Sequence, residues 1–185
     1  MAEPHLLLNR AGASDAAAAL RRCCGSERWV QALLAARPYA SSPELFALAE
    51  HVWQSLGADD YLEAFSHHPQ IGEDLSALRQ RFAGTATLSA REQAGVAEAD
   101  EAVLLALREG NRAYRERFGF IFIVCASGKS AREMLALLEA RIENDREAEL
   151  RIAAAEQAKI TRIRLEGLAA FESLGVPSKL RSSSG

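Results

Sequence analysis

The stretch SPELFALAEHVWQSLG, residues 42–57, places its apolar side chains three and four residues apart. Pro43 suits the first turn of a helix, and Gly57 suits the residue just past its end. The apolar positions that share one side of such a helix are Leu45, Leu48, Ala49, Val52, Trp53 and Leu56. The spacing therefore predicts an amphipathic helix with one buried face.

Similar spacing continues along most of the chain, in which alanine is the most frequent residue and leucine the next. Both residues favour helices, whereas aromatic residues, which favour strands, make up only 6% of the chain. Helices are also predicted over residues 14–23, 27–37, 59–66, 89–118, 130–142 and 145–174. The longest of these has one continuous stripe, formed by Leu104, Leu107, Asn111, Tyr114 and Phe118.

One segment departs from the helical pattern. Residues 118–126, FGFIFIVCA, are rich in the β-branched and aromatic residues that suit a strand. No second strand is predicted to pair with it, so we expect a short extended segment buried between helices. The predicted fold is all-α: a single-domain helical bundle of seven or eight helices over residues 1–177, followed by a flexible tail at 178–185.

The chain carries 22 Lys and Arg against 25 Asp and Glu, a net charge of −3. A nucleic-acid-binding protein would carry a basic surplus on one face, so we expect no nucleic-acid partner. No apolar run approaches the ~20 residues of a membrane span, and Leu6–Leu8 is too short for the core of a signal peptide. We therefore expect a cytoplasmic protein without membrane association, whose three cysteines stay reduced.

The tripeptide Gly128-Lys129-Ser130 follows an apolar run and is similar to the end of a phosphate-binding loop. That motif requires a glycine at position 123, where the chain has isoleucine, and a parallel sheet to carry the loop. Ser130 is better explained as the N-cap residue of the following helix. Nucleotide binding at this place is therefore the weaker interpretation.

His67 and His68 end a predicted helix just before Pro69. A residue that precedes proline is pushed toward an extended backbone, so the His68 ring can project from the chain reversal. A histidine in this position is usually solvated or hydrogen-bonded locally. We predict no metal site at this place.

The segment Ser89–Gln93, SAREQ, has a serine followed three residues later by Glu92. This is the pattern of a capping box, and helix-start chemistry accounts for both residues. The free N–H groups of a helix start can also bind a negatively charged or carbonyl-rich ligand, to which Gln93 would add an amide. The spacing favours the cap without excluding the ligand site.

Arg164 lies, on a helical wheel, among the apolar residues of the last predicted helix, such as Ile163, whereas Arg162 lies on the solvent side. Burying an unpaired guanidinium is costly, so Arg164 either reaches solvent or meets a partner. The partner could be a structural carboxylate, as in a non-catalytic interaction module, or a ligand with matching oxygens. A ligand becomes the better explanation only if His68 and Glu92 face the same cavity.

Five segments occur in an order that identifies a family: HPQIG at 68–72, SAREQ at 89–93, Asn111 with Tyr114, FGFIFIVCA at 118–126 and KITRIRL at 159–165. Together they resemble the OHCU decarboxylase family over about residues 10–172. Enzymes of this family convert 2-oxo-4-hydroxy-4-carboxy-5-ureidoimidazoline (OHCU), an intermediate of urate degradation, to (S)-allantoin. The resemblance implies an all-helical carboxy-lyase that needs no cofactor and forms a homodimer.

The resemblance also implies roles for individual residues. The catalytic histidine, glutamate and arginine of the family match His68, Glu92 and Arg164 of this chain. The chain departs from many relatives at Ile121, where they have proline, and at HPQIG, which many animal relatives replace by HPDLA; these changes concern the shape of the pocket more than the activity. The residues implied to contact substrate are Pro69, Ser89, Ala90, Arg91, Glu92, Gln93, Phe122, Ile123, Val124, Cys125 and Ala126.

Overall fold

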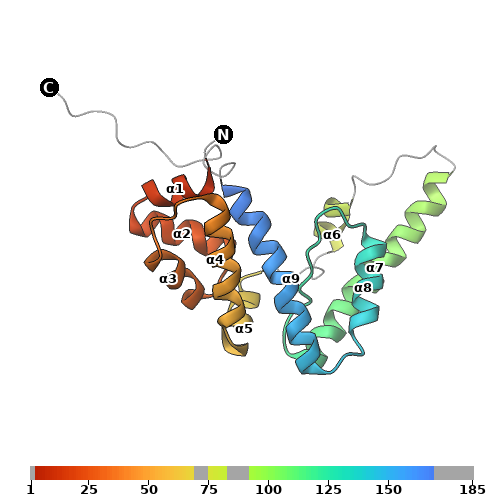
Figure 1. Ribbon diagram of the computed structural model, residues 1–185. Helices are drawn as coiled ribbons and strands as arrows, with labels where there is room; N and C mark the ends of the chain where they lie inside the picture. Colours follow the sequence, from red (N-terminus) through yellow and green to blue (C-terminus); the bar gives the residue numbers. More distant parts are fainter. Residues whose placement is uncertain (1–2, 69–74, 83–91, 169–185) are drawn as a thin grey trace. The chain divides into compact units, whose positions relative to one another are not determined.

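The computed structural model describes residues 3–68, 75–82 and 92–168, without the side chains of residues 77, 81, 82 and 92–99. Within these ranges the chain forms nine helices and no strand (Figure 1), which confirms the predicted all-α class. The chain divides into two compact units. Unit one holds the residues up to Asp60 and those from Ala158 onward, and unit two spans Tyr61–Gln157. A single domain over residues 1–177 stays a prediction, and the tail at 178–185 lies outside the described residues.

Unit one is built mainly from four helices that pack on one another (Figure 1). Its centre contains the fully buried side chains of Leu20, Trp29, Leu33 and Leu45. The indole N–H of Trp29 donates a hydrogen bond to the main-chain oxygen of Ala49 at 2.9 Å, so this large aromatic is buried with its polar group satisfied. The four helices are α1 (Pro4–Arg10), α2 (Ala13–Cys23), α3 (Glu27–Ala35) and α4 (Ser42–Ser55).

Helix α4 corresponds to the predicted helix at 42–57. Its N-cap residue is Ser41, whose hydroxyl accepts from the main-chain N–H of Glu44 at 3.2 Å, so the helix begins at Ser42, the first residue of the predicted stretch. Leu45, Ala49 and Trp53 are buried, which confirms the apolar face read from the spacing.

Unit two contains the longest helix, which packs beside α8 (Figure 1). The predicted stripe from Leu104 to Phe118 is buried throughout. A Cβ atom at Gly110 would lie 2.8 Å from Cδ2 of Leu138, so glycine permits the close approach of the two helices. The elements of this unit are the end of α5 (Ala58–Ser66), α6 (Leu75–Phe82), α7 (Glu92–Phe118), α8 (Ala131–Arg141) and the first half of α9 (Arg146–Glu166).

The chain between α7 and α8 behaves as the sequence predicted. Gly119, with φ of +79°, ends α7 in a conformation that favours glycine, and its N–H donates to the Arg115 carbonyl at 2.9 Å. Phe120 and Phe122 are buried, and no strand is formed in this described segment. Ser130 caps α8 in a reciprocal capping box with Glu133, as expected for a helix start and not for a phosphate loop.

Two helices were not predicted, α1 and α6. They contain seven and eight residues, about two turns each, and two turns are too few for a spacing of three and four to stand out from irregular sequence. All three cysteines are buried free thiols, as expected. Among the described helices, none combines the length and the apolar character needed to cross a bilayer.

Candidate active site

His68 lies just beyond the end of α5, in unit two. Its main-chain N–H donates to the Phe65 carbonyl at 3.1 Å, which continues the last turn of the helix. The ring is half-buried, and its Nε2 atom lies 2.5 Å from Oε1 of Gln157 on α9. An amide oxygen only accepts hydrogen bonds, so in this contact Nε2 of His68 carries the hydrogen. The expected projection of the ring from the chain reversal thus ends on a buried partner.

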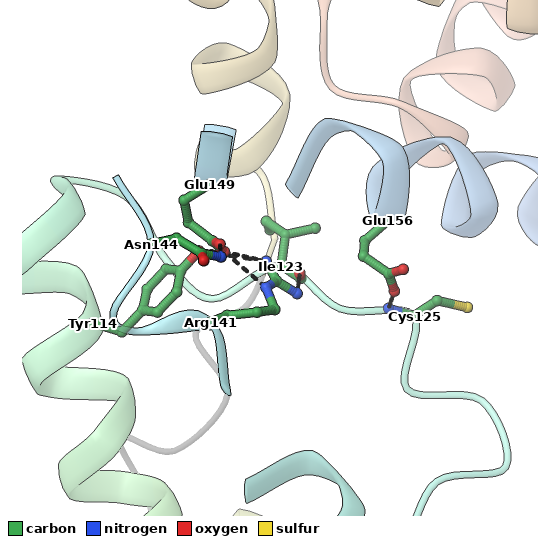
Figure 2. Close-up of polar contacts among 7 residues, drawn as sticks. All are labelled: Tyr114, Ile123, Cys125, Arg141, Asn144, Glu149 and Glu156. Atoms are coloured by element: carbon green, nitrogen blue, oxygen red, sulfur yellow. Dashed lines mark hydrogen bonds and ion pairs between the residues drawn. The ribbon is translucent and has the colours of Figure 1, made fainter. Parts of the chain in front are cut away.

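The predicted substrate-contacting segment Phe122–Ala126 is held by its main chain. Figure 2 shows Arg141 and Glu156 directed at this segment: Nη1 of Arg141 donates to the Ile123 carbonyl at 2.9 Å, and Cys125 N–H donates to Oε2 of Glu156 at 2.7 Å. The Cys125 carbonyl accepts from Nζ of Lys129 at 2.8 Å. The segment is therefore fixed on both sides of Val124 by charge-assisted hydrogen bonds.

A buried polar network supports this segment (Figure 2). The Glu149 carboxylate at its centre is fully buried. It accepts two hydrogen bonds from Arg141, from Nε at 2.8 Å and from Nη2 at 2.5 Å. It also accepts from Nδ2 of Asn144 at 2.8 Å and from the Tyr114 hydroxyl. Burial, reinforced by the hydrogen bond to Glu149, raises the pKa of Tyr114 well above its ordinary value, so this phenol stays a neutral donor. The Arg141 guanidinium also stacks 4.6 Å from the Phe122 ring centroid.

Arg164 belongs to unit one and is half-buried. Its Nη1 atom donates to the main-chain oxygens of Arg22 and Cys23, at 3.3 and 3.4 Å. These are the last carbonyls of α2, where the partial negative charge of a helix end is located. Burial raises the pKa of the Cys23 thiol to about 12, against the opposing effect of Arg164, so this thiol is neutral and supplies no countercharge. In the described residues the partners of Arg164 are thus carbonyl groups and not a structural carboxylate.

The predicted apolar face of α9 is wrong at Ile163, which is 45% exposed. The buried face of this part of α9 includes Leu168, as predicted, and also Thr161 and Leu165. Thr161 is buried there although it is polar, because its hydroxyl donates to the Cys23 carbonyl at 3.5 Å. Arg162 is exposed, as predicted.

Several predicted site residues lie outside the described part of the chain: Pro69, Ser89, Ala90 and Arg91. Glu92 and Gln93 begin α7, but their side chains also lie outside it. His68 and the segment Phe122–Ala126 are described within unit two, and Arg164 within unit one. The convergence of His68, Glu92 and Arg164 on one cavity therefore stays a prediction. Among the described side chains, no group of three His, Cys, Asp or Glu is arranged to hold a metal ion.

The comparisons with solved structures define the class of protein. The crystal structure of OHCU decarboxylase in the presence of (S)-allantoin is 39% identical in sequence, with a TM-score of 0.64 over 81% of this chain and 96% of that one. The model of the OHCU decarboxylase family matches residues 9–166, and this chain belongs to that family of carboxy-lyases. The resemblance read from the five segments is confirmed.

Two curated relatives agree. The chain is 37% identical over 147 residues to the uric acid degradation bifunctional protein TTL of Arabidopsis thaliana, a match that covers 79% of this chain and 45% of the relative. It is 31% identical over 140 residues to the 2-oxo-4-hydroxy-4-carboxy-5-ureidoimidazoline decarboxylase of Amia calva, with 74% and 77% covered. The chain thus matches less than half the length of the Arabidopsis protein.

Proposed function

We propose that this chain decarboxylates OHCU to (S)-allantoin in urate degradation, without a cofactor. The observation that carries the proposal is the match of residues 9–166 to the family, together with 39% identity to an OHCU decarboxylase whose solved chain is covered over 96% of its length. A match of this extent includes every segment that supplies a candidate site residue.

The chemistry of the substrate explains why no external electron acceptor is required. OHCU carries its carboxylate and hydroxyl on one ring carbon, beside a ring C=N. When the bond to the carboxylate breaks, its electron pair forms a C=C bond with the neighbouring carbon, and the C=N pair moves to the nitrogen, which takes up a proton. The hydroxyl then loses its proton as the carbonyl forms, and the neighbouring carbon gains one, so one proton is consumed overall. Because the ring accepts the pair, the protein has to supply orientation and proton transfer.

We assign these tasks to the predicted site residues. His68 and Glu92 handle the protons, and Arg164 binds substrate oxygens and stabilises charge that moves into the ring. The fixed ring of His68 and the guanidinium of Arg164, whose partners in the described residues are neutral carbonyls, support this assignment. Orientation, and with it the single enantiomer, comes from the main chain of Phe122–Ala126 and from the remaining predicted contacts: Pro69, Ser89, Ala90, Arg91 and Gln93.

A homodimer in the cytoplasm completes the proposal. Both features come from the family resemblance and the composition, and neither enters the chemistry above. Light scattering of the purified chain at several concentrations measures the oligomeric state: a mass near twice 20.1 kDa is expected, and a constant monomer mass would remove the dimer from the proposal.

The activity is tested from urate, with urate oxidase and the hydrolase of the preceding step supplied. Circular dichroism is followed as the chain is added. We expect fast appearance of one allantoin enantiomer, and a slow drift to racemate identical to the blank would overturn the proposal. Replacing His68 with Ala should lower the rate by about 10²–10⁴-fold, the usual contribution of a general acid or base, with the far-ultraviolet spectrum of the helices unchanged. A wild-type rate in that variant would remove His68 from the mechanism.

A further inference from the structure

Gln157 is a fully buried polar residue on α9, in a position where periodicity would place an apolar side chain. A buried amide is costly unless it is hydrogen-bonded. Its oxygen lies 2.5 Å from Nε2 of His68, which is 89 residues away in sequence. The partner of this amide is therefore the residue to which the proposed function gives the proton-handling role.

We propose that Gln157 is a positioning residue for His68: it fixes the rotation of the ring and keeps the hydrogen of the neutral ring on Nε2. This inference rests on the proposed function. The amide oxygen accepts and cannot donate, so it selects one of the two neutral forms of the ring. It also adds no charge, whereas a carboxylate in its place would favour the protonated imidazolium.

Glu156, the residue before Gln157, also contacts the candidate site, which indicates that this turn of α9 holds the site in place. Glu156 accepts from the main-chain N–H of Cys125 at 2.7 Å (Figure 2). Two consecutive residues of α9 therefore hold two different parts of the predicted site, the His68 ring and the segment Phe122–Ala126. Because both lie on one rigid helix, the ring and the segment keep a constant geometry relative to each other.

The hydrogen position is measured by ¹⁵N-resolved NMR of the full chain. A proton directly bonded to Nε2 of His68 should be visible and protected from exchange with water, and it is identified by its absence in His68→Asn. Gln157→Met, which keeps the length of the side chain but has no oxygen, should lose this signal. Gln157→Glu keeps an accepting oxygen and should retain it. The matched control is Gln54→Met at an exposed position of α4, which should leave the signal unchanged.

Steady-state kinetics supply the second measurement. Gln157→Met should lower kcat by roughly ten- to a hundredfold, the scale on which misplacement of a reacting group acts, with KM and the melting temperature nearly unchanged. A ring proton found on Nδ1, or an Nε2 proton unaffected by Gln157→Met, would overturn the inference, as would a change in KM alone. Should His68→Asn retain full turnover, the role of His68 in the proposed function fails, while the NMR result still decides how Gln157 holds the ring.

Discussion

Arg141 and Arg164 are both held against main-chain carbonyls, but they differ in what else surrounds them. The Arg141 side chain is 9% exposed, and its Nε, Nη1 and Nη2 atoms all donate within the protein, two of them to the Glu149 carboxylate. Arg164 is half-buried, and in the described residues it donates from Nη1 alone, to the neutral carbonyls of Arg22 and Cys23. The first arginine is neutralised by the Glu149 carboxylate. The second contacts only neutral carbonyls among the described residues, which fits its proposed role in binding an anionic substrate.

The largest effect on stability is expected from Arg141. Arg141→Ala leaves the fully buried Glu149 without its countercharge, and the loss of one partner of a buried pair costs about 3–5 kcal/mol of unfolding free energy. Equilibrium unfolding in urea measures it. The double variant Arg141→Met/Glu149→Leu removes both charges and should recover most of the loss. A single variant as stable as the wild type would show that Arg141 is not a structural residue, and the contrast with Arg164 would disappear.

Arg164→Ala should show the opposite pattern, a loss of activity without a loss of fold. Removal of a donor that stabilises developing charge lowers kcat/KM by about 10²–10³-fold, while the melting temperature changes little because only two long bonds to carbonyls are lost. Arg164→Lys keeps the charge but not the planar arrangement of donors and should recover only part of the rate. The dichroism assay measures both. A variant that melts early in proportion to its lost activity would place Arg164 beside Arg141, as a structural residue.

The sequence predicted the helices better than it predicted these partners. Caps and apolar spacing located α4, α7 and α8 because those signals are local in the chain. The network around Glu149 joins Tyr114, Arg141 and Asn144, which lie on different elements of the chain. A charged residue in a helical pattern is normally predicted to face solvent, so the burial of Glu149 was not expected. Nothing in the spacing distinguishes Glu149 from the exposed Glu147. Long-range pairing of this kind needs the packed structure.

The same argument applies to the candidate site. His68 could be singled out because proline follows it, but its pairing with Gln157 could not be predicted, since the two residues are 89 positions apart in sequence. The burial of the polar Thr161 on α9 was missed for a related reason, because its hydroxyl finds its partner, the Cys23 carbonyl, on a distant part of the chain. Family resemblance supplied the residue roles, and physical reasoning on spacing alone left Arg164 between a ligand and a structural carboxylate.

A smaller loss of activity is expected from substitution of Glu156, whose carboxylate holds the main chain of the predicted site and not a substrate group. Glu156→Ala removes the acceptor of the Cys125 N–H, so the predicted substrate-contacting segment loses one of its anchors. A lost hydrogen bond to a charged group is worth about 1.5–3 kcal/mol, and we expect kcat/KM to fall by about tenfold through looser orientation. Glu156→Gln keeps an accepting oxygen and should recover most of the rate. Equal losses in both variants would show that the charge of Glu156 matters, and not the anchoring of Cys125.

The smallest effect is expected at Arg162, two residues from Arg164 on the same helix. Its guanidinium lies 4.1 Å from the Phe46 ring centroid and pairs with Glu166 at 2.5 Å, with both charged side chains about half exposed. An exposed ion pair contributes about 0–1 kcal/mol, and an exposed cation–π contact contributes about 0.5–1 kcal/mol. Arg162→Ala should therefore lower the unfolding free energy by no more than about 2 kcal/mol, with no change in turnover. The variant is the matched control for Arg164→Ala, because each removes one positive charge from the same end of α9. If both lowered kcat/KM equally, the general positive potential of this helix end would explain the loss, and the direct contact with substrate assigned to Arg164 would be wrong.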